Sequence, residues 1–312
     1  MQRGLYKNMQ ICAINSGYWD TKVFNGRQQF KFRTKLDEGQ EIINSQNTAR
    51  IIYEGNNYIL GDGAERYSLE YDKTTSLLHK ISTYYSLSRL IERQDEFKIM
   101  VALPLNVFST LKSTYETYLK TKDYTPINVN GINKFIHVSD CKVFPEGPAA
   151  LYANNPDRYK NDIVGILDIG SLTVNGCIMS NLNLVRESIF TINSGTIILY
   201  NKLRKELNKK FLLNLREYEI PNIIKNGLKL NGSAKEIQQI IDSVIYEHLQ
   251  EVITEMRKNN WPIESLKILL TGGGSLLLEQ YLFKVLPGAL MGQDAVYDNV
   301  KGLYEVAKVV YP

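Results

Sequence analysis

Short apolar runs alternate with amphipathic stretches along the chain, and several apolar runs end at glycine-containing turns. The segment 12–26, CAINSGYWDTKVFNG, predicts two strands around a turn at Gly17. The segment 165–179, GILDIGSLTVNGCIM, has the same outline: one strand ends at Asp168 and the next begins after Gly170. Both segments are typical of β-hairpins whose turns are rich in small polar residues.

Strand-like and helical segments alternate in the rest of the chain. Residues 97–119 predict a strand, a turn and a helix, and 132–155 predict strands followed by the start of a helix. Ser233 and Glu236 predict a capping box that opens a long helix. Apolar residues then recur at helical spacing, at positions 237, 240, 241, 244, 245, 249, 252, 253 and 256. This alternation favours an α/β protein.

A longer repeat relates the two hairpin segments. Setting Asn15 against Asp168 gives an offset of 153 residues, close to half of the chain. The same offset aligns Ile14 with Leu167, Gly17 with Gly170 and Asp20 with Thr173. We therefore predict two related α/β halves that face each other, at 1–160 and 161–312, with the C-terminal helix as a candidate to pack on the first half.

Composition and charge limit the class of protein and its cellular location, but they do not identify a reaction. The 312 residues are 44% hydrophobic and 22% charged, and no segment approaches the ~20 apolar residues that a membrane span needs. The N-terminus lacks the apolar core of a signal peptide, so we expect a cytoplasmic protein. The Lys-, Asn- and Ile-rich composition is typical of an AT-rich bacterial genome. A net charge of +4, without a basic stripe interleaved with aromatic residues, predicts no direct nucleic-acid binding.

The cysteines and histidines do not predict a metal centre. The three cysteines lie far apart in strand-like runs, which favours buried reduced thiols over a disulfide framework. They are Cys12, Cys141 and Cys177. The three histidines form no cluster, and His248 falls on the apolar stripe of the long helix, where a core histidine is expected. The lysine-rich segment 201–210 is typical of a solvated helix face, and the alternative is that Lys202 or Glu206 borders a ligand pocket.

The two hairpin turns suit a phosphate chain. Small residues let backbone N–H groups approach anionic oxygens, and hydroxyls donate further hydrogen bonds. Two such turns facing each other could bind β- and γ-phosphates from both sides. Asp168 could hold Mg²⁺ through water, because Mg²⁺ keeps most of its aqua ligands. Lys22, in the second strand of the first hairpin, is placed to reach back toward the phosphates.

A third turn, Thr271-Gly272-Gly273-Gly274-Ser275, lies between an apolar strand and a helix. Successive glycines let a flat or anionic ligand lie on bare backbone at a helix N-terminus. A tight strand–helix connection is the alternative. Each of the three turns alone is a weak signal, and all three in this order form a strong one.

These segments resemble the motifs of the actin-like ATPase superfamily, and most closely those of the ParM-like plasmid-segregation actins. The two phosphate loops resemble 14–22, INSGYWDTK, and 167–175, LDIGSLTVN, and the adenosine motif resembles 269–277, LLTGGGSLL. The segment 143–153, VFPEGPAALYA, is similar to the first connecting motif. The resemblance implies an actin-like fold of two related α/β domains with a nucleotide cleft between them.

The resemblance also implies a role for each matched residue. Glu146 would orient the attacking water, and Asp168 would hold Mg²⁺ through water. Nucleotide contacts are implied for Asn15, Ser16, Gly17, Lys22, Gly170, Ser171, Thr173, Gly272, Gly273 and Gly274. The implied cofactors are Mg²⁺ and ATP, with GTP as the alternative nucleotide. The implied reaction is phosphoryl transfer to water.

Two positions depart from the family pattern. Asn15 and Asn175 stand where the family usually carries aspartate. Each exchange removes a negative charge near the polyphosphate, although an amide can still hydrogen-bond a metal-bound water. Mg²⁺ should then bind less tightly, or Asp168 must carry more of that role.

The resemblance implies a filament. Nucleotide-bound subunits would polymerise head-to-tail, because a heterologous interface that does not close gives an open polymer. Hydrolysis would then destabilise the polymer and drive plasmid DNA segregation. The implied partners are further copies of the chain and a DNA-binding adaptor protein at a centromere-like plasmid site, with neither a membrane nor direct contact to nucleic acid.

A non-polymerising enzyme of the same superfamily is the alternative. It could be a small-molecule kinase or a chaperone-type ATPase. The chain is short for a sugar kinase and shows no obvious aspartate base for a second substrate, and no chaperone substrate domain follows its C-terminus. Fold alone does not separate these classes, whereas nucleotide-dependent growth of large particles does.

Overall fold

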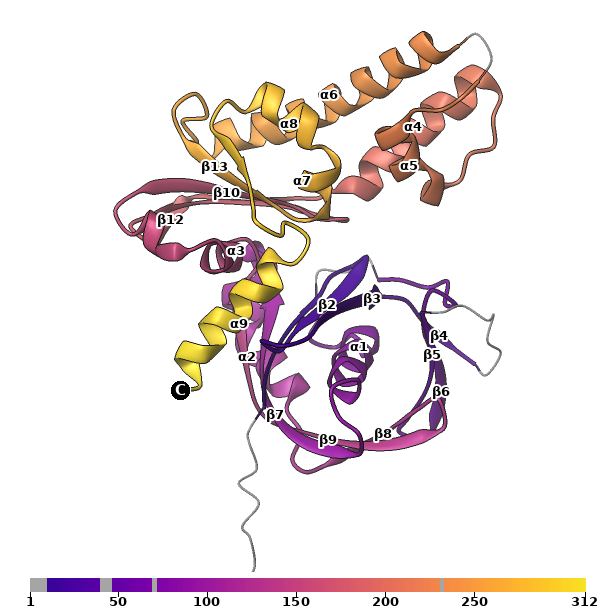
Figure 1. Cartoon of the computed structure of the whole chain (residues 1–312), viewed down its shortest axis with the longest axis vertical. Helices are drawn as coiled ribbons and strands as arrows, with labels where there is room; N and C mark the ends of the chain where they lie inside the picture. Colours follow the sequence, from indigo (N-terminus) through magenta and orange to yellow (C-terminus); the bar gives the residue numbers. More distant parts are fainter. Residues whose placement is uncertain (1–9, 40–46, 69–71, 231–232) are drawn as a thin grey trace, which may run out of the picture. The chain divides into compact units, whose positions relative to one another are not determined.

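The computed structural model describes residues 10–39, 47–68, 72–230 and 233–312. The chain forms two compact units, and each has its own hydrophobic core. The first unit is built from the chain up to Pro145 and from Val300 onward, and the second is Glu146–Asn299. Each unit is described separately below, with the labels of Figure 1.

The unit boundary differs from the predicted division at 160. Residues 146–160 belong to the second unit because α3 (Pro148–Ala153) packs against β10 (Ile163–Ile169). The C-terminal residues from Val300 onward belong to the first unit. There the Tyr304 ring lies 5.1 Å from that of Phe24.

Within the described residues, the first unit contains a nine-stranded sheet in the order β3-β2-β1-β7-β9-β8-β5-β6-β4. The central strands β1, β7 and β9 are parallel, and the other pairs are antiparallel. The strands are β1 (Gln10–Ser16), β2 (Asp20–Phe24), β3 (Gln29–Arg33), β4 (Leu36–Glu38), β5 (Thr48–Tyr53), β6 (Asn56–Gly61), β7 (Gln94–Leu103), β8 (Thr125–Val129) and β9 (Ile132–Pro145).

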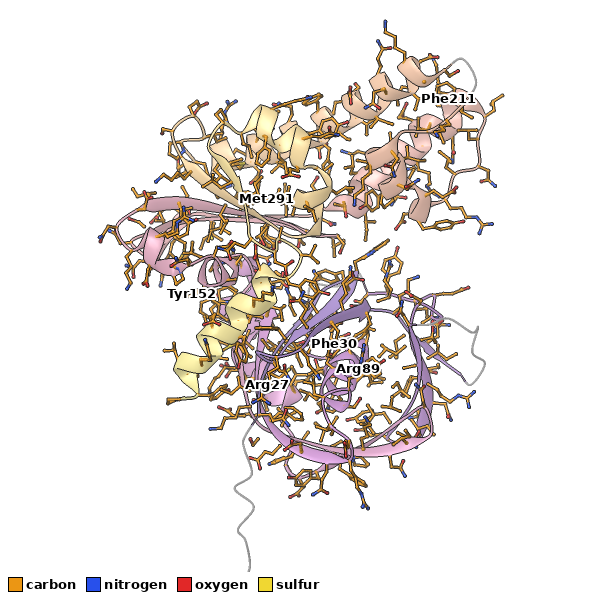
Figure 2. The ribbon with its side chains drawn as sticks, viewed as in Figure 1. Arg27, Phe30, Arg89, Tyr152, Phe211 and Met291 are labelled. Atoms are coloured by element: carbon orange, nitrogen blue, oxygen red, sulfur yellow. The ribbon has the colours of Figure 1, made fainter. Side chains whose placement is uncertain are left out.

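The sheet of the first unit curves around helix α1 (Leu77–Ser88), which has no exposed residue (Figure 1). Two of its buried hydroxyls bond to the helix itself: Thr83 donates to the His79 carbonyl and Ser86 to the Ser82 carbonyl. The buried Ser82 hydroxyl has no hydrogen-bond partner among the described residues. Arg89 follows α1 and stacks on the Phe30 ring of β3 at 4.1 Å (Figure 2). Helix α2 (Leu105–Leu119) packs beside α1 and along β9.

The second unit contains a five-stranded sheet in the order β12-β11-β10-β13-β14. Strands β10, β13 (Lys267–Thr271) and β14 (Ala289–Met291) are parallel, and β11 (Val174–Ser180) and β12 (Asn183–Ile192) are antiparallel. The remaining helical segments are η1 (Pro156–Tyr159), α4 (Thr196–Phe211), η2 (Glu217–Glu219), α5 (Ile220–Asn226), α6 (Ala234–Lys258), α7 (Gly273–Leu277), α8 (Glu279–Val285) and α9 (Asp298–Val310).

Helix α6 is the long helix predicted from the apolar stripe. The buried residues follow the predicted spacing, except that Ile240 is only partly buried and His248 is fully buried. The predicted capping box is wrong. Ser233 is the N-cap residue, but its backbone is not extended and its side chain makes no capping bond. Glu236 forms an ion pair with Lys210 at 2.9 Å instead.

Two glycines in the second unit's sheet make room for aromatic side chains. A Cβ atom at Gly165 would lie 2.5 Å from the Trp261 ring, and one at Gly176 would lie 2.2 Å from the Phe190 ring. The two rings meet edge to face at 5.7 Å, and the Trp261 indole N–H donates to the Ser188 carbonyl. The other tryptophan, Trp19, lies in the first unit, where Arg33 stacks on it at 3.5 Å.

The predicted free cysteines are confirmed. All three thiols are buried and unpaired, and burial raises the pKa of each well above its ordinary value. In the part of the chain that the structure describes, no group of metal-ligating side chains was found. Every helix in that part is too short or too polar to cross a lipid bilayer.

His248 is a core residue, as predicted. Its Nδ1 lies 3.5 Å from the Ser194 hydroxyl, and its Nε2 has no hydrogen-bond partner among the described residues. Burial lowers the pKa of His248 to about 4, despite the opposing effect of the nearby Glu251 carboxylate. The imidazole is therefore neutral in the folded chain at neutral pH.

The neutral state of His248 makes stability depend on pH. The unfolded chain takes up a proton near the ordinary histidine pKa, and the folded chain does so only near pH 4. The stabilisation is therefore present above about pH 6.5 and is lost as the pH falls. Between pH 7.5 and 5.5 the loss should be about 1.3 kcal/mol from this residue. Urea unfolding of wild type and His248→Gln at both pH values tests this, because the variant should lose that part of the pH dependence. An unchanged dependence would contradict the assignment.

Candidate functional site

The two predicted turns have matching strand registers. Asn15 of β1 pairs with Lys22 of β2, and Asp168 of β10 pairs with Asn175 of β11. Asn15 and Asp168 are 153 residues apart, as are Lys22 and Asn175. The repeat aligned in the sequence is therefore also a repeat of strand pairing.

The same backbone hydrogen bond closes both turns. The Gly17 N–H donates to the Asp20 carbonyl at 3.2 Å, and the Gly170 N–H donates to the Thr173 carbonyl at 2.9 Å. Both turns stand at the carboxyl end of a central parallel strand. In α/β sheets this is the edge where ligands bind.

In the first turn, the strand alternation separates two sets of side chains. Asn15 and Lys22 share one face, and Ser16 lies on the other. The Ser16 hydroxyl is 3.1 Å from the Thr21 hydroxyl and 2.9 Å from Nδ1 of His79 in helix α1. The hydroxyl of Ser16 is thus part of a buried network, and a phosphate contact by it stays a prediction.

His79 was not predicted from the sequence, because a lone histidine near a helix start carries no local signal. Burial lowers its pKa well below the usual range, and the nearby Lys73 ammonium lowers it further. The imidazole is therefore neutral. Its contact fixes the Ser16 side chain from the core side of the turn.

The two asparagines that replace family aspartates differ in their surroundings. The Asn15 Oδ1 atom is buried and has no hydrogen-bond partner among the described residues. The Asn175 Oδ1 atom accepts from the Thr191 hydroxyl at 2.8 Å, and its Nδ2 lies 3.4 Å from the Thr173 hydroxyl. Asn15 therefore offers an acceptor to a ligand, whereas the Asn175 amide is held by its neighbours.

The second turn directs its carbonyl groups toward the start of helix α4. The Gly170 and Ser171 carbonyls accept from the Thr196 and Ile197 N–H groups. A Cβ atom at Gly195 would lie 2.4 Å from the Ser171 carbonyl oxygen, so this close approach requires glycine. Among the described residues, no hydrogen bond is made by the Ser171 N–H group. Such a free N–H group in a tight turn suits an anionic oxygen.

Asp168 lies at the centre of the second unit's sheet edge. It is 6% exposed and lies in register between Asn175 of β11 and Thr271 of β13. Its Oδ2 atom accepts a hydrogen bond from Nδ2 of Asn299 at 3.0 Å. The predicted carboxylate is thus buried, oriented and placed where the sheet edge could take a ligand.

The three glycines of the third turn have different surroundings. A Cβ atom at Gly272, which has φ +88°, would lie 2.4 Å from the Ile169 carbonyl oxygen and 2.5 Å from Oδ1 of Asp168. One at Gly274 would meet the Ile169 and Thr196 side chains. Gly273 alone is exposed with open space around it. Only Gly273 therefore presents the bare backbone that the sequence predicted for a ligand.

Glu146 begins the second unit in the turn before α3. It is 7% exposed, and Gly147 follows it with φ +87°. Pro148 then opens the helix, in the position that proline favours. The Gly147 N–H donates to Oδ1 of Asn299 at 2.9 Å, which ties this turn to the residue that also holds Asp168.

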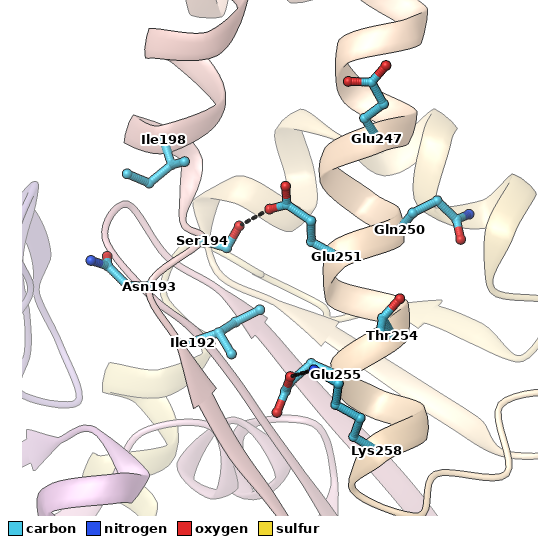
Figure 3. A pocket seen from close by; sticks show the side chains of 10 residues that line it. All are labelled: Ile192, Asn193, Ser194, Ile198, Glu247, Gln250, Glu251, Thr254, Glu255 and Lys258. Atoms are coloured by element: carbon cyan, nitrogen blue, oxygen red, sulfur yellow. Dashed lines mark hydrogen bonds and ion pairs between the residues drawn. The ribbon is translucent and has the colours of Figure 1, made fainter.

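Two cavities lie between the helices of the second unit, and no predicted site residue lines either. A cavity of about 510 Å³ lies beside α6, where Ser194 donates to the Glu251 carboxylate at 3.1 Å (Figure 3). A second cavity, of about 340 Å³, lies between α4 and α6 and includes Lys202 and Glu206. These two residues, predicted to form a solvated face, border a hollow.

Each turn, taken separately, has an oxygen donor of the kind that Mg²⁺ prefers. In the second unit it is the Asp168 carboxylate, and in the first unit it is the unpartnered Oδ1 of Asn15. Asn175 does not fit as well, because its amide oxygen already accepts from Thr191.

Comparison with protein families assigns the chain. The family model for the N-terminal domain of actin-like proteins matches residues 13–148, and the model for the C-terminal domain of archaeal MreB-like actin homologues matches residues 166–284. The chain therefore belongs to the actin-like protein family. Among curated proteins, no relative matches it.

Solved structures of actin homologues share this fold over nearly the whole chain. Apo pSK41 ParM is 18% identical, with 97% of this chain and 98% of that chain covered at a TM-score of 0.75. The Alp12 filament structure is 20% identical, with 98% and 100% covered at 0.74. Ta0583, an archaeal actin homologue in complex with ADP, is 16% identical, with 96% and 100% covered at 0.80. At these identities the likeness establishes the actin-like fold.

Proposed function

We propose that this chain is a nucleotide-dependent, filament-forming actin-like protein that hydrolyses ATP to drive plasmid DNA segregation. The observation that carries the proposal is the pair of matched turns, each closed by the same hydrogen bond at the carboxyl end of a central parallel strand. An unpartnered buried amide oxygen in the first turn and a buried carboxylate in the second add the chemistry of a Mg²⁺-nucleotide site.

Different residues would bind different parts of the nucleotide. The small turn residues (Asn15, Ser16, Gly17, Gly170, Ser171, Thr173) bind phosphate oxygens chiefly through backbone N–H groups. Lys22 adds a positive charge on the face that Asn15 shares. The glycine turn at 272–274 contacts the nucleoside, with Gly273 as its accessible backbone. ATP is the proposed nucleotide and GTP the alternative.

Hydrolysis would use one group of residues at the metal ion and another at the attacking water. Asp168 would hold Mg²⁺ through water, and Asn15 would accept a hydrogen bond from a metal-bound water. The ion would supply positive charge that stabilises the transferring phosphoryl group. Glu146 accepts a hydrogen bond from the attacking water and orients it. Because Glu146 is nearly buried and its turn is tied to Asn299, the carboxylate is oriented before the water binds.

The proposal that this chain forms a filament is supported by similarity of fold. The Alp12 structure is that of a filament, and the Ta0583 structure holds ADP. We propose that this chain assembles head-to-tail with its own copies in the bacterial cytoplasm. A DNA-binding adaptor at a centromere-like plasmid site would connect the polymer to its cargo, so that the chain itself touches no nucleic acid.

Right-angle light scattering with parallel phosphate release tests the proposal. The purified chain is measured before and after Mg-ATP or Mg-GTP is added. We expect a large rise in scattering that decays as phosphate appears, and the nucleotide that produces it is the substrate. A lasting rise without phosphate would contradict hydrolysis. No rise with either nucleotide, at concentrations well above those at which actins polymerise, would overturn the filament and favour a non-polymerising enzyme.

A further inference from the structure

Asn299 occupies a position that no predicted role explains. It lies at the start of helix α9, beyond the residues that either family model matches, and it is 6% exposed. Its amide oxygen accepts from the Gly147 N–H at 2.9 Å, and its amide nitrogen donates to Oδ2 of Asp168 at 3.0 Å. One side chain thus contacts both the turn that carries Glu146 and the carboxylate of the phosphate turn.

The segment that carries Asn299 is itself fixed. The Gly292 N–H donates to the Leu270 carbonyl, and the Ala295 carbonyl accepts from the Gly272 N–H, both in or beside strand β13. The Gln293 N–H donates to Oδ1 of Asn154 at the end of α3. The loop that precedes helix α9 is therefore hydrogen-bonded both beside β13 and at the end of α3. These bonds fix the segment from which the Asn299 amide projects.

The contacts of Asn299 also determine how its amide is turned. Oδ1 must face the Gly147 N–H because a backbone N–H can only donate, and Nδ2 must face Asp168 because an ionised carboxylate can only accept. Neither a carboxylate nor an aliphatic side chain can make both bonds. The pair of contacts therefore requires an amide at this position.

We propose that Asn299 is a positioning residue for hydrolysis. It holds Glu146 and Asp168 in a fixed mutual geometry, so that the water-orienting carboxylate and the phosphate turn act together. The inference rests on the proposed nucleotide hydrolysis and adds to it a residue that acts through its bonds to Gly147 and Asp168. Small displacements of groups that position a reaction can cost about 10²-fold in rate, which sets the scale of the expected effect.

The test compares two substitutions at this position in the full-length chain. Asn299→Ala removes both hydrogen bonds, and Asn299→Asp keeps the acceptor for Gly147 while placing a carboxylate beside Asp168. We expect both to lower single-turnover phosphate release from Mg-ATP by about 10- to 100-fold. The nucleotide Kd should change less than about 3-fold, because the phosphate-binding N–H groups remain.

Hydrogen exchange at the Gly147 amide is an independent readout. Asn299→Ala should remove its protection, and Asn299→Asp should retain it. Asn208→Ala is the matched control, because the Asn208 amide also makes two hydrogen bonds, both to the Leu215 backbone, yet contacts neither Gly147 nor Asp168. This control should lose stability and keep the wild-type rate of phosphate release.

Several results would overturn the proposal. Wild-type rates in folded Asn299→Ala, or an equal loss of rate in Asn208→Ala, would show that Asn299 does not position the reacting groups. Loss of folding in both Asn299 variants would show a purely structural role. A wild-type chain that binds no nucleotide would overturn the proposed function and this inference together, whereas a hydrolysing wild type with unaffected variants would overturn this inference alone.

Discussion

Replacing Glu146 with Gln should lower the rate of phosphate release about 100-fold or more, since positioned acid–base groups contribute 10²–10⁴ to such reactions. Glutamine keeps the volume of the side chain and its nearly buried position, but it cannot accept the proton of the attacking water. Nucleotide binding should remain, because the phosphate turns are untouched. The measurement is single-turnover phosphate release at saturating Mg-ATP, together with the Kd of a fluorescent nucleotide.

Light scattering provides a second measurement on the same variant. If hydrolysis destabilises the filament, Glu146→Gln should produce a scattering rise that lasts longer than that of wild type. Glu187→Gln is the matched control, because it makes the same change of charge at an exposed position of β12. A folded Glu146→Gln protein that releases phosphate at the wild-type rate would show that this carboxylate does not orient the water.

Replacing Gly272 with Ala should destabilise the second unit by about 3 kcal/mol, from a backbone conformation reserved for glycine and from overpacking. The residue has φ +88° and ψ +156°, and the added Cβ would lie 2.4 Å from the Ile169 carbonyl oxygen. That oxygen belongs to the central strand of the sheet and cannot move away easily. The added atom would also lie 2.5 Å from Oδ1 of Asp168, so the variant should bind Mg-nucleotide more weakly.

The neighbouring glycine supplies the control for this prediction. A Cβ atom at Gly273 would meet nothing within 4 Å. Gly273→Ala should therefore change the free energy of unfolding by less than about 1 kcal/mol, the difference between glycine and alanine in a helix. Urea unfolding of both variants and of wild type makes the comparison. Equal costs at the two positions would contradict the close packing described at Gly272.

Local patterns predicted most of the elements that form the candidate site. The two hairpins, the glycine turn and the α6 stripe each depend on short-range spacing, which the sequence displays directly. The alignment of Asn15 with Asp168 corresponds to equivalent strand registers in the structure. The fold class followed because alternating strands and helices leave few other architectures.

Contacts between distant residues could not be predicted in the same way. Asn299 meets Gly147 and Asp168 across more than a hundred residues, and a single asparagine before a helix carries no sign of such partners. The contact of His79 with Ser16 also has no local sign in the sequence. Half of the residues in helix α1 are His, Lys, Ser or Thr, so only the surrounding sheet reveals that the hydroxyls of Thr83 and Ser86 are buried and bonded to carbonyls of the helix itself. The capping box was wrong because backbone conformation at Ser233, and not residue type, decides whether its side chain can bond.

The chain has two tryptophans, one in each compact unit, and their environments differ. Trp261 is buried against Gly165 and Phe190, whereas Trp19 lies in the turn between β1 and β2, where the Arg33 guanidinium stacks on it. Each unit thus contains its own intrinsic fluorophore. Unfolding of the two units can be followed separately without any label, by pairing the wild-type emission with that of Trp19→Phe. Such measurements would show whether the halves of this duplicated chain unfold together or one after the other.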